Sequence, residues 1–365
     1  MTIREYGPVR AMREDRRRFA ALREHRVLIY WPHGFGDWVH LGYVLPLLEP
    51  SNCYAVTRYG DDSVTVMEGN SVAVALYGGV LAPDDGSREG VPHLGLSLRR
   101  CNGKAVALHL AEPLASNVVT FAPDALLWTD YPETEGRTAY PFHTKARNAA
   151  RLLVSPQRLA TFDLSKPLQS AVDFTAPADV RRRVDERLAQ FAPPGTRICV
   201  VSRRGATAAR KNWGDGVETR EFAELLRKDS PAWRVVSMEE EDLGAGSAGF
   251  RALFADLRLP FGVLLKAVCA RIDLLVGVPA GPLHFALARG GIAVVGLWLA
   301  HHPDWYDEPN PLATHLVGNY VCERGFDRRI ASTSKPPSLQ HRLRYLETSG
   351  IAARAVLEAA LELTS

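Results

Sequence analysis

The stretch from Val276 to Arg289, VGVPAGPLHFALAR, carries residue types that could bind a phosphate. An apolar run of strand length ends there, and a helix is predicted to begin at Pro282, because proline suits the first position of a helix. Unpaired N–H groups and the positive end of the helix dipole attract anions. We therefore expect Gly281, Pro282, Leu283 and His284 to surround a phosphate, with the N–H groups of Gly281, Leu283 and His284 donating. The alternative is an ordinary strand-to-helix turn with a packed histidine.

A second stretch, SRRGATAARKNW over residues 202–213, is strongly cationic and follows the apolar run RICVVS. Arg203, Lys211 and the hydroxyl of Thr207 could bind a diphosphate, because guanidinium, ammonium and hydroxyl groups all donate to phosphate oxygens. A solvated basic loop is the alternative.

An acidic run, Glu239 to Asp242, follows the next predicted strand. Acidic side chains at this position of nucleotide-binding sheets commonly bind ribose hydroxyls. Glu239 and Glu240 are therefore candidate nucleoside ligands, and a solvated charge run is the alternative.

Near the N-terminus, PHGFGDW spans residues 32–38 and follows another apolar run. Its glycines half-match a dinucleotide fingerprint, but the third glycine would fall at Val39, so a nicotinamide site has little support. Asp37 could take a proton from a bound hydroxyl as a general base. It could equally be a helix N-cap, where aspartate is common.

The elements that would position these loops alternate between strand and helix. Apolar runs of strand length occur at 27–31, 54–57, 72–76, 105–110, 125–128, 197–202, 233–238, 273–278 and 292–298. Helical patterns occur at 8–25, 38–48, 177–190, 219–228, 250–257, 261–270, 282–289 and 351–363. Such alternation predicts doubly wound parallel sheets, in which ligands bind beyond the carboxyl ends of the strands. We expect an α/β fold of two Rossmann-like domains facing a central cleft.

Composition excludes several classes of protein. The chain has 365 residues, with Lys+Arg 44 and Asp+Glu 41, so its net charge is +3 and a dense basic face for nucleic acid is not expected. The five cysteines are odd in number and form no CxxC, which argues against a disulfide framework or a zinc cluster and favours the cytoplasm. No apolar run approaches the ~20 residues that span a bilayer.

The absence of common catalytic motifs is also informative. The sequence contains no D-x-D, HExxH, GxSxG or GxxxxGK[ST]. Readings as a metal-held nucleotide-sugar enzyme, a zinc or serine hydrolase, or a P-loop protein therefore lose their usual support. We expect no metal and no cofactor.

Taken together, these stretches resemble the ADP-heptose:lipopolysaccharide heptosyltransferase family, a GT-B glycosyltransferase family (family 9). GFGDW resembles its GD motif, and RKNWGDGVETREFAELL resembles its K-x-W-P…F-x-x-L segment. MEEED follows the next strand, and DLLVGVPAGPLHFALARGGIAVVGLW resembles the D-[ST]-G-x-x-H-x-x-A-A block. The resemblance covers about residues 195–300 and, in the first half, about residues 27–48.

The resemblance implies roles for particular residues. Asp37 would be the catalytic base and Lys211 would hold a donor phosphate. An acidic residue of the run at Glu239 and Glu240 would bind the ribose, and Phe261 would line the adenine pocket.

Three neighbours of the base are candidate acceptor contacts, namely Gly36, Trp38 and His40. Two departures predict a divergent member of the family. Pro279-Ala280 stands where the family has Asp-[Ser/Thr], and Trp213-Gly214 stands in place of Trp-Pro.

From about residue 164 to residue 180 the chain has two prolines and few periodic apolar residues, which predicts a linker between two domains. Residues 1–165 would form the acceptor-side domain with an added basic helix, and 166–195 would be a linker. Residues 196–345 would bind the nucleotide sugar, and 346–365 would be a C-terminal helix.

The activity that we expect is inverting, metal-independent transfer of a sugar, a heptose or a related one, from an ADP-sugar to an acceptor hydroxyl or amine. The protein would be a monomer or weak dimer with at most peripheral membrane contact. A nucleotide-sugar epimerase and a catalytically inactive nucleotide-binding protein of the same fold remain alternatives, and a dehydrogenase is a weaker one.

Overall fold

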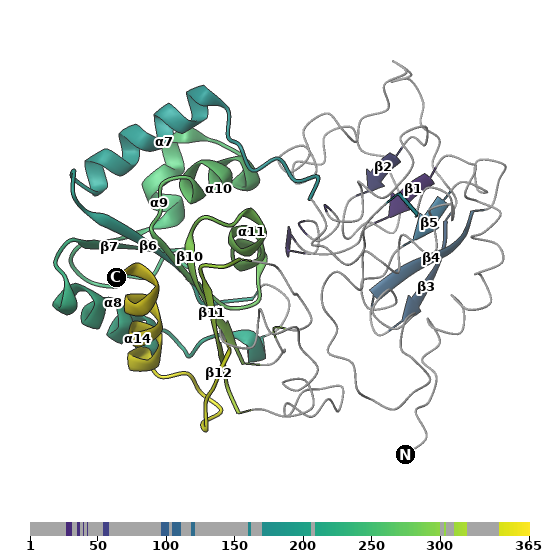
Figure 1. Cartoon of the computed structure of the whole chain (residues 1–365). Coiled ribbons are helices and arrows are strands. Elements are labelled where there is room, and N and C mark those ends of the chain that lie inside the picture. The colour runs from purple at the N-terminus through teal and green to yellow at the C-terminus, as the bar shows by residue number, and fades with distance from the viewer. Residues whose placement is uncertain are drawn as a thin grey trace. The chain divides into compact units, whose positions relative to one another are not determined.

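The computed structural model in Figure 1 describes part of the chain. The described residues are 27–30, 35–36, 39, 42, 54–57, 96–101, 104–110, 118–120, 160–161, 170–205, 209–299, 303, 310–319 and 343–365. The chain divides into two compact units, of which the first comprises 1–135 and 140–173 and the second comprises 136–139 and 174–365.

The first unit contains a small parallel sheet. Its order is β2 (Tyr54–Thr57), β1 (Val27–Tyr30) and β5 (Val118–Thr120), and both pairings are parallel. The strands predicted at 27–31 and 54–57 are therefore confirmed. A second pair, β3 (Leu96–Cys101) and β4 (Lys104–Leu110), is antiparallel.

Only β4 of that antiparallel pair was expected from the sequence. The two residues between the strands are Asn102 and Gly103. Asn-Gly between two strand-forming runs is a strong local signal for a two-residue hairpin. Attention to this dipeptide would have predicted β3 as well.

The second unit is built on a seven-stranded sheet in which all neighbouring strands are parallel. The order across the sheet is β12 (Leu343–Tyr345), β11 (Ala313–Val317), β10 (Ala293–Trp298), β9 (Leu274–Gly277), β6 (Arg197–Ser202), β7 (Trp233–Ser237) and β8 (Ser247–Gly249). The chain thus winds outward from β6 to one edge and then from β9 to the other. The predicted α/β class and the doubly wound parallel sheet are confirmed here.

Helices cover both faces of this sheet (Figure 1). On one side lie α8 (Val217–Asp229) and α14 (Ala353–Thr364). On the other lie α7 (Ala178–Phe191), α9 (Phe250–Phe254) with the 3-10 turn η5 (Ala255–Leu257), α10 (Phe261–Cys269) and α11 (Gly281–Arg289).

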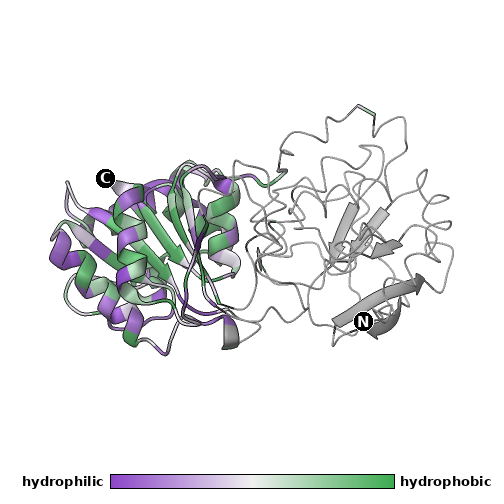
Figure 2. Ribbon diagram, turned by 60° about the horizontal axis from the view of Figure 1, so that its bottom comes forward, coloured by the Kyte–Doolittle hydropathy of each residue, from purple (hydrophilic) through white to green (hydrophobic). Residues whose placement is uncertain are grey.

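Burial on both faces explains why the strands are continuous apolar runs. Every residue of β9, β10 and β11 is buried, and Figure 2 shows apolar residues in the strands and on the sheet-facing sides of the helices. Alternate strand residues such as Cys199 and Val201 pack with Phe222 of α8 and Val356 of α14 in one core cluster.

Most elements of the second unit were predicted within one or two residues. The predicted linker at 166–195 contains α7, whose buried Val180, Val184 and Leu188 belong to the second unit. The sequence analysis did not predict β8, β11 or β12. β8 and β12 have only three residues each, too short for a clear period.

Candidate functional site

The strand order of the second unit places a switch point between β6 and β9. β6 pairs with β7 on one side and with β9 on the other, and the chain leaves β6 and β9 toward opposite edges of the sheet. In open α/β sheets the loops separate at such a switch point and leave a crevice beyond the carboxyl ends. The loop after Ser202 and the turn after Gly277 border this place, and the N–H of Val278 donates to the carbonyl of Ser202 at 2.9 Å.

The turn after β9 leads into α11, which has no side-chain cap. Its N-cap is Ala280 in extended backbone (φ −143°, ψ 173°), and the helix begins at Gly281, one residue before the predicted start. Gly281 and Leu283 occupy the first turn, where N–H groups have no acceptor within the helix, and Pro282 has no N–H at all. The structure therefore gives this helix end the features of an anion site.

One detail of the prediction for α11 is wrong. The N–H of His284 donates to the carbonyl of Ala280 at 3.1 Å, because the fourth position after the N-cap is the first that can close a helical hydrogen bond. Only the N–H groups of Gly281 and Leu283 remain as candidate phosphate donors. His284 could still contribute its side chain.

The His284 side chain is buried beside the ring of Trp298, which in turn lies beside that of His315. It is 4% exposed, and its ring lies edge-on to Trp298 with centroids 6.5 Å apart. The indole Nε1–H of Trp298 donates to Nδ1 of His315 at 3.0 Å. A Cβ at Gly296 would lie 2.6 Å from that Nδ1, so the glycine leaves the space that His315 fills. Neither Trp298 nor His315 was a candidate from the sequence.

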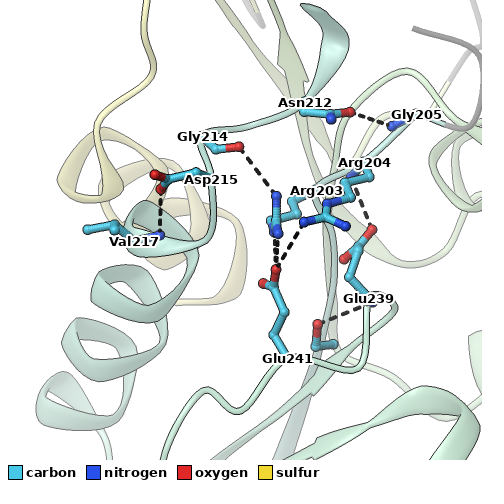
Figure 3. A network of polar contacts seen from close by, with 10 residues as sticks. Arg203, Arg204, Gly205, Asn212, Gly214, Asp215, Val217, Glu239 and Glu241 are labelled. Atoms are coloured by element: carbon cyan, nitrogen blue, oxygen red, sulfur yellow. Dashed lines mark hydrogen bonds and ion pairs between the residues drawn. The ribbon is translucent and has the colours of Figure 1, made fainter. Parts of the chain in front are cut away.

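Arg203 connects the cationic loop after β6 to neighbouring segments through hydrogen bonds of its side chain (Figure 3). Arg203 is 1% exposed, its Nε and Nη2 donate to Oε1 of Glu241, and its Nη1 donates to the carbonyl of Gly214 at 3.3 Å. The hydrogen bond and charge of Glu241 raise the pKa of Arg203 above its ordinary value. All three guanidinium nitrogens thus have partners inside the protein, and the predicted phosphate contact of Arg203 would compete with them.

Lys211 ends the 3-10 turn η4 (Ala209–Lys211) in the same loop and is partly exposed. The two residues that follow it are fixed. Asn212 accepts from the N–H of Gly205 at 3.0 Å, and the indole N–H of Trp213 donates to the carbonyl of Ile351 at 2.7 Å. The phosphate role of Lys211 stays a prediction, but its place in the chain is well defined.

The members of the acidic run have different partners. Glu240, in left-handed backbone at φ 60°, accepts from the N–H groups of Arg251 and Ala252 and so caps α9. Asp242 accepts from the N–H of Gly244 at 2.9 Å. Glu240 therefore has a structural task, and its predicted nucleoside contact stays a prediction.

Glu239 has spare hydrogen-bonding capacity, as does Glu241. One carboxylate oxygen accepts from the N–H of Arg204 at 3.0 Å, whereas Oε2 is buried with no hydrogen-bond partner in the structure. Burial raises the pKa of Glu239, against the opposing effect of the N–H groups of Arg203 and Arg204. A buried oxygen without a partner is costly, and a ligand hydroxyl would satisfy it. This is the property expected of a ribose ligand.

Phe261 lies at the start of α10 and is 43% exposed, which is unusual for a phenylalanine. Its ring lies 6.0 Å from that of Phe250, at a tilt of 60°. An exposed aromatic face can stack on a base. The adenine contact of Phe261 stays a prediction.

Several predicted site residues lie outside the described part of the chain, namely Asp37, Trp38, His40 and Thr207. Gly36 is described, and it is buried in helical backbone. The two cysteines that the structure describes in the second unit, Cys199 and Cys269, are buried thiols. Burial raises the pKa of Cys269 to about 12 and that of Cys199 further, so neither is a ready nucleophile.

Comparison with known proteins gives matches in structure. No protein-family model matches the chain, and neither does any of the curated proteins with which it was compared. Among the solved structures similar to this chain is the ADP-heptose lps heptosyltransferase II of E. coli, with 12% identity and a TM-score of 0.49 over 93% of this chain and 98% of that chain. Another is a glycosyl transferase of family 9 from Veillonella parvula, with 15% identity and a TM-score of 0.48 over 94% of this chain and 98% of that chain.

A third similar structure is TibC from enterotoxigenic E. coli H10407, an iron-containing dodecameric glycosyltransferase. It shares 14% identity with a TM-score of 0.46, over 93% of this chain and 76% of that chain. TibC is also known in complex with ADP-D-beta-D-heptose. The family that the sequence motifs resemble is thus also the family of these structures.

TibC corrects one expectation. We expected no metal and no cofactor, and a similar protein is iron-containing. Within the described residues, no group of three or more His, Cys, Asp or Glu side chains could hold a metal ion. The residues that the structure describes therefore do not fit iron. The expected monomer or weak dimer stays a prediction.

The described residues include no helix that is long and apolar enough to cross a membrane.

Proposed function

We propose that this chain is a glycosyltransferase that moves a sugar, a heptose or a related one, from a nucleoside diphosphate sugar to an acceptor hydroxyl or amine, with inversion. The observation that carries the proposal is the uncapped N-terminus of α11 at the switch point of a parallel sheet. The motif resemblance and the similar structures support glycosyl transfer and an ADP-sugar as the donor.

The second unit would bind the donor. The N–H groups of Gly281 and Leu283 would donate to the diphosphate, and Lys211 would balance the charge that grows on it as it leaves. Oε2 of Glu239 would accept a hydrogen bond from a ribose hydroxyl. Each well-placed donor to a developing charge can contribute roughly 2.7–4 kcal/mol to transition-state stabilisation.

The first unit would supply the base. An acceptor oxygen attacks the anomeric carbon as the bond from that carbon to the diphosphate oxygen breaks, and the diphosphate leaves with the electron pair. Asp37 takes the acceptor's proton, and Trp38 and His40 would contact the acceptor. Attack on the face opposite the leaving group inverts the anomeric configuration.

Nucleotide binding is the first test. A thermal-shift panel of ADP, GDP, UDP and dTDP should show the largest rise in Tm with ADP, because ligand binding to the folded state stabilises it by mass action. Lys211→Ala should reduce that rise. If none of the four nucleotides raises the Tm, the proposed donor site is wrong.

Turnover is the second test. Asp37→Asn should lower kcat by at least about 10²-fold and leave ADP affinity nearly unchanged, because the base acts on the acceptor. Normal turnover of Asp37→Asn would remove the residue from this role. Incubation with donor alone checks the epimerase alternative, since an epimerase would change the donor sugar without any acceptor.

A further inference from the structure

We infer that Arg203 is a positioning residue, which sets the place of Lys211 through a buried ion pair with Glu241 and does not itself bind donor phosphate. The inference rests on the proposed function for the role of Lys211. The inference itself concerns the contacts that hold Lys211 in place, and not its binding of phosphate.

The loop between β6 and α8 is closed on itself. The N–H of Trp213 donates to the carbonyl of Arg203 at 2.8 Å, and the N–H of Gly205 donates to Oδ1 of Asn212 at 3.0 Å. The Nη1 of Arg203 donates to the carbonyl of Gly214 at 3.3 Å. Three hydrogen bonds thus join the segment just after β6 to the segment just after Lys211, as Figure 3 shows for two of them.

Glu241 anchors this closed loop to the neighbouring strand. It follows β7, which pairs with β6, and its Oε1 receives both Nε and Nη2 of Arg203. The side chain of Arg203 is 2% exposed and that of Glu241 is 21% exposed, so the pair is shielded from water. The planar guanidinium reaches Glu241 and the Gly214 carbonyl together, because its donors point in fixed, different directions.

The surroundings leave room for this pair and for little else. A Cβ at Gly216 would lie 3.3 Å from Oε1 of Glu241 and 3.6 Å from Nη2 of Arg203, and Gly216 has φ +116°. The far side of the loop is held by Trp213, whose ring packs edge-on against Phe222 at 6.0 Å. Lys211 lies directly before Asn212, and the three residues that follow it all have fixed contacts. Arg203, which Glu241 holds in place, supplies one of these contacts through the carbonyl of Gly214.

The direction in which Glu241→Gln changes ADP affinity distinguishes a positioning role of Arg203 from direct contact with phosphate. If Arg203 bound phosphate, Glu241→Gln would free the guanidinium from a competing charge, and ADP would bind as well or more tightly. If Arg203 positions the loop, the same variant loosens it. ADP should then bind about fivefold to tenfold more weakly, a coupling of ordinary size for a buried network.

The experiment compares the full-length wild type with Glu241→Gln, Arg203→Lys, Lys211→Ala and the double variant R203K/K211A. Calorimetry gives ADP affinity. Arg203→Lys should weaken binding in the wild-type background and have no further effect in the Lys211→Ala background, because its action passes through that lysine. The matched control is Asp242→Asn, a change of the same charge in the same acidic run that leaves the pair intact and should not alter affinity. Unchanged or tighter binding of ADP to Glu241→Gln, or additive effects in the double variant, would overturn the inference.

A second readout does not depend on nucleotide binding. In Glu241→Gln and Arg203→Lys, hydrogen exchange at the amides of Gly205 and Trp213 should be faster, whereas exchange in the β6 strand should stay slow. If wild type binds no nucleotide, the proposed function fails while this measurement still reports on the loop. Unchanged protection at both amides would overturn the positioning role. Slow exchange in β6 also shows that the variants are folded.

Discussion

Glu239 and Glu241 differ in how the protein uses their carboxylates. One oxygen of Glu241 receives two donors from the Arg203 side chain, and one oxygen of Glu239 accepts from the backbone N–H of Arg204. Both have a second, buried oxygen without a hydrogen-bond partner in the structure. Glu239 is not committed to an ion pair in the fold, so it is the better candidate for ligand contact.

The pKa of Glu239 leads to a pH-dependent prediction. Burial raises this pKa above the ordinary value of 4.5, so the folded protein keeps the proton where the unfolded chain has lost it. The stability that Glu239 contributes is present below about pH 4.5 and is lost as the pH rises through the folded-state pKa. Glu239→Gln removes the charge, so its Tm minus the wild-type Tm should increase between about pH 4 and about pH 8. Differential scanning fluorimetry across this range measures the difference.

The control for that series is Glu221→Gln, which makes the same change on the exposed surface of α8. Its Tm difference should be flat across the same range. A flat profile for Glu239→Gln would mean that the carboxylate is hydrated in the folded protein.

The hydrogen bond between Trp298 and His315 gives a prediction for stability. His315→Leu leaves the buried indole N–H without this acceptor and should lower the free energy of unfolding by about 1–3 kcal/mol. His315→Gln offers an acceptor oxygen and should cost less. Urea unfolding of both variants gives the difference, and equal losses would show that ring packing, and not the hydrogen bond, is what matters.

At the scale of the element, the missing cap of α11 links stability to binding. Serine at an N-cap accepts from a first-turn N–H and is typically worth about 1 kcal/mol relative to alanine. Ala280→Ser should therefore stabilise the free protein, and it should weaken ADP binding because the hydroxyl competes for an N–H that we assign to phosphate. Thermal unfolding and calorimetry measure the two effects.

A matched control exists in the same unit. Ala352 is the N-cap of α14, also in extended backbone and without a side-chain cap. Ala352→Ser should raise stability in the same way and leave ADP affinity unchanged. If Ala280→Ser behaves like Ala352→Ser in both measurements, the helix end of α11 does not bind the nucleotide.

At the scale of the whole molecule, the chain consists of two units with separate sheets. We expect calorimetric unfolding in two transitions, of which ADP shifts only one. A hundredfold excess of ADP over its Kd should stabilise that unit by about 2.7 kcal/mol. The buried Trp213, Trp233 and Trp298 all belong to the second unit, so the transition that moves should be accompanied by a change in tryptophan fluorescence. A shift of both transitions would show that the nucleotide contacts both units.

The sequence by itself was sufficient for most elements of the second unit, but not for β8, β11 and β12. β6 matches its predicted range, and β7, α10, β10 and α14 match theirs within two residues. Strands that are buried on both faces appear in the sequence as short apolar runs bounded by Gly and Pro. They can therefore be recognised from a few neighbouring residues. The turn before α11, to which we assign the diphosphate, could be recognised for the same reason, since proline at a helix start and an adjacent glycine are local signals.

Only the tertiary structure decided which polar side chains are left for a ligand. Arg203 and Glu241 are 38 residues apart in the chain, and their pairing depends on β6 and β7 being neighbours in the sheet. Trp298 and His315 meet because β10 and β11 pair in a register that places Gly296 opposite His315. A side chain's type shows what it can bind, but its partners depend on strand order and register, because these bring distant residues within hydrogen-bond distance.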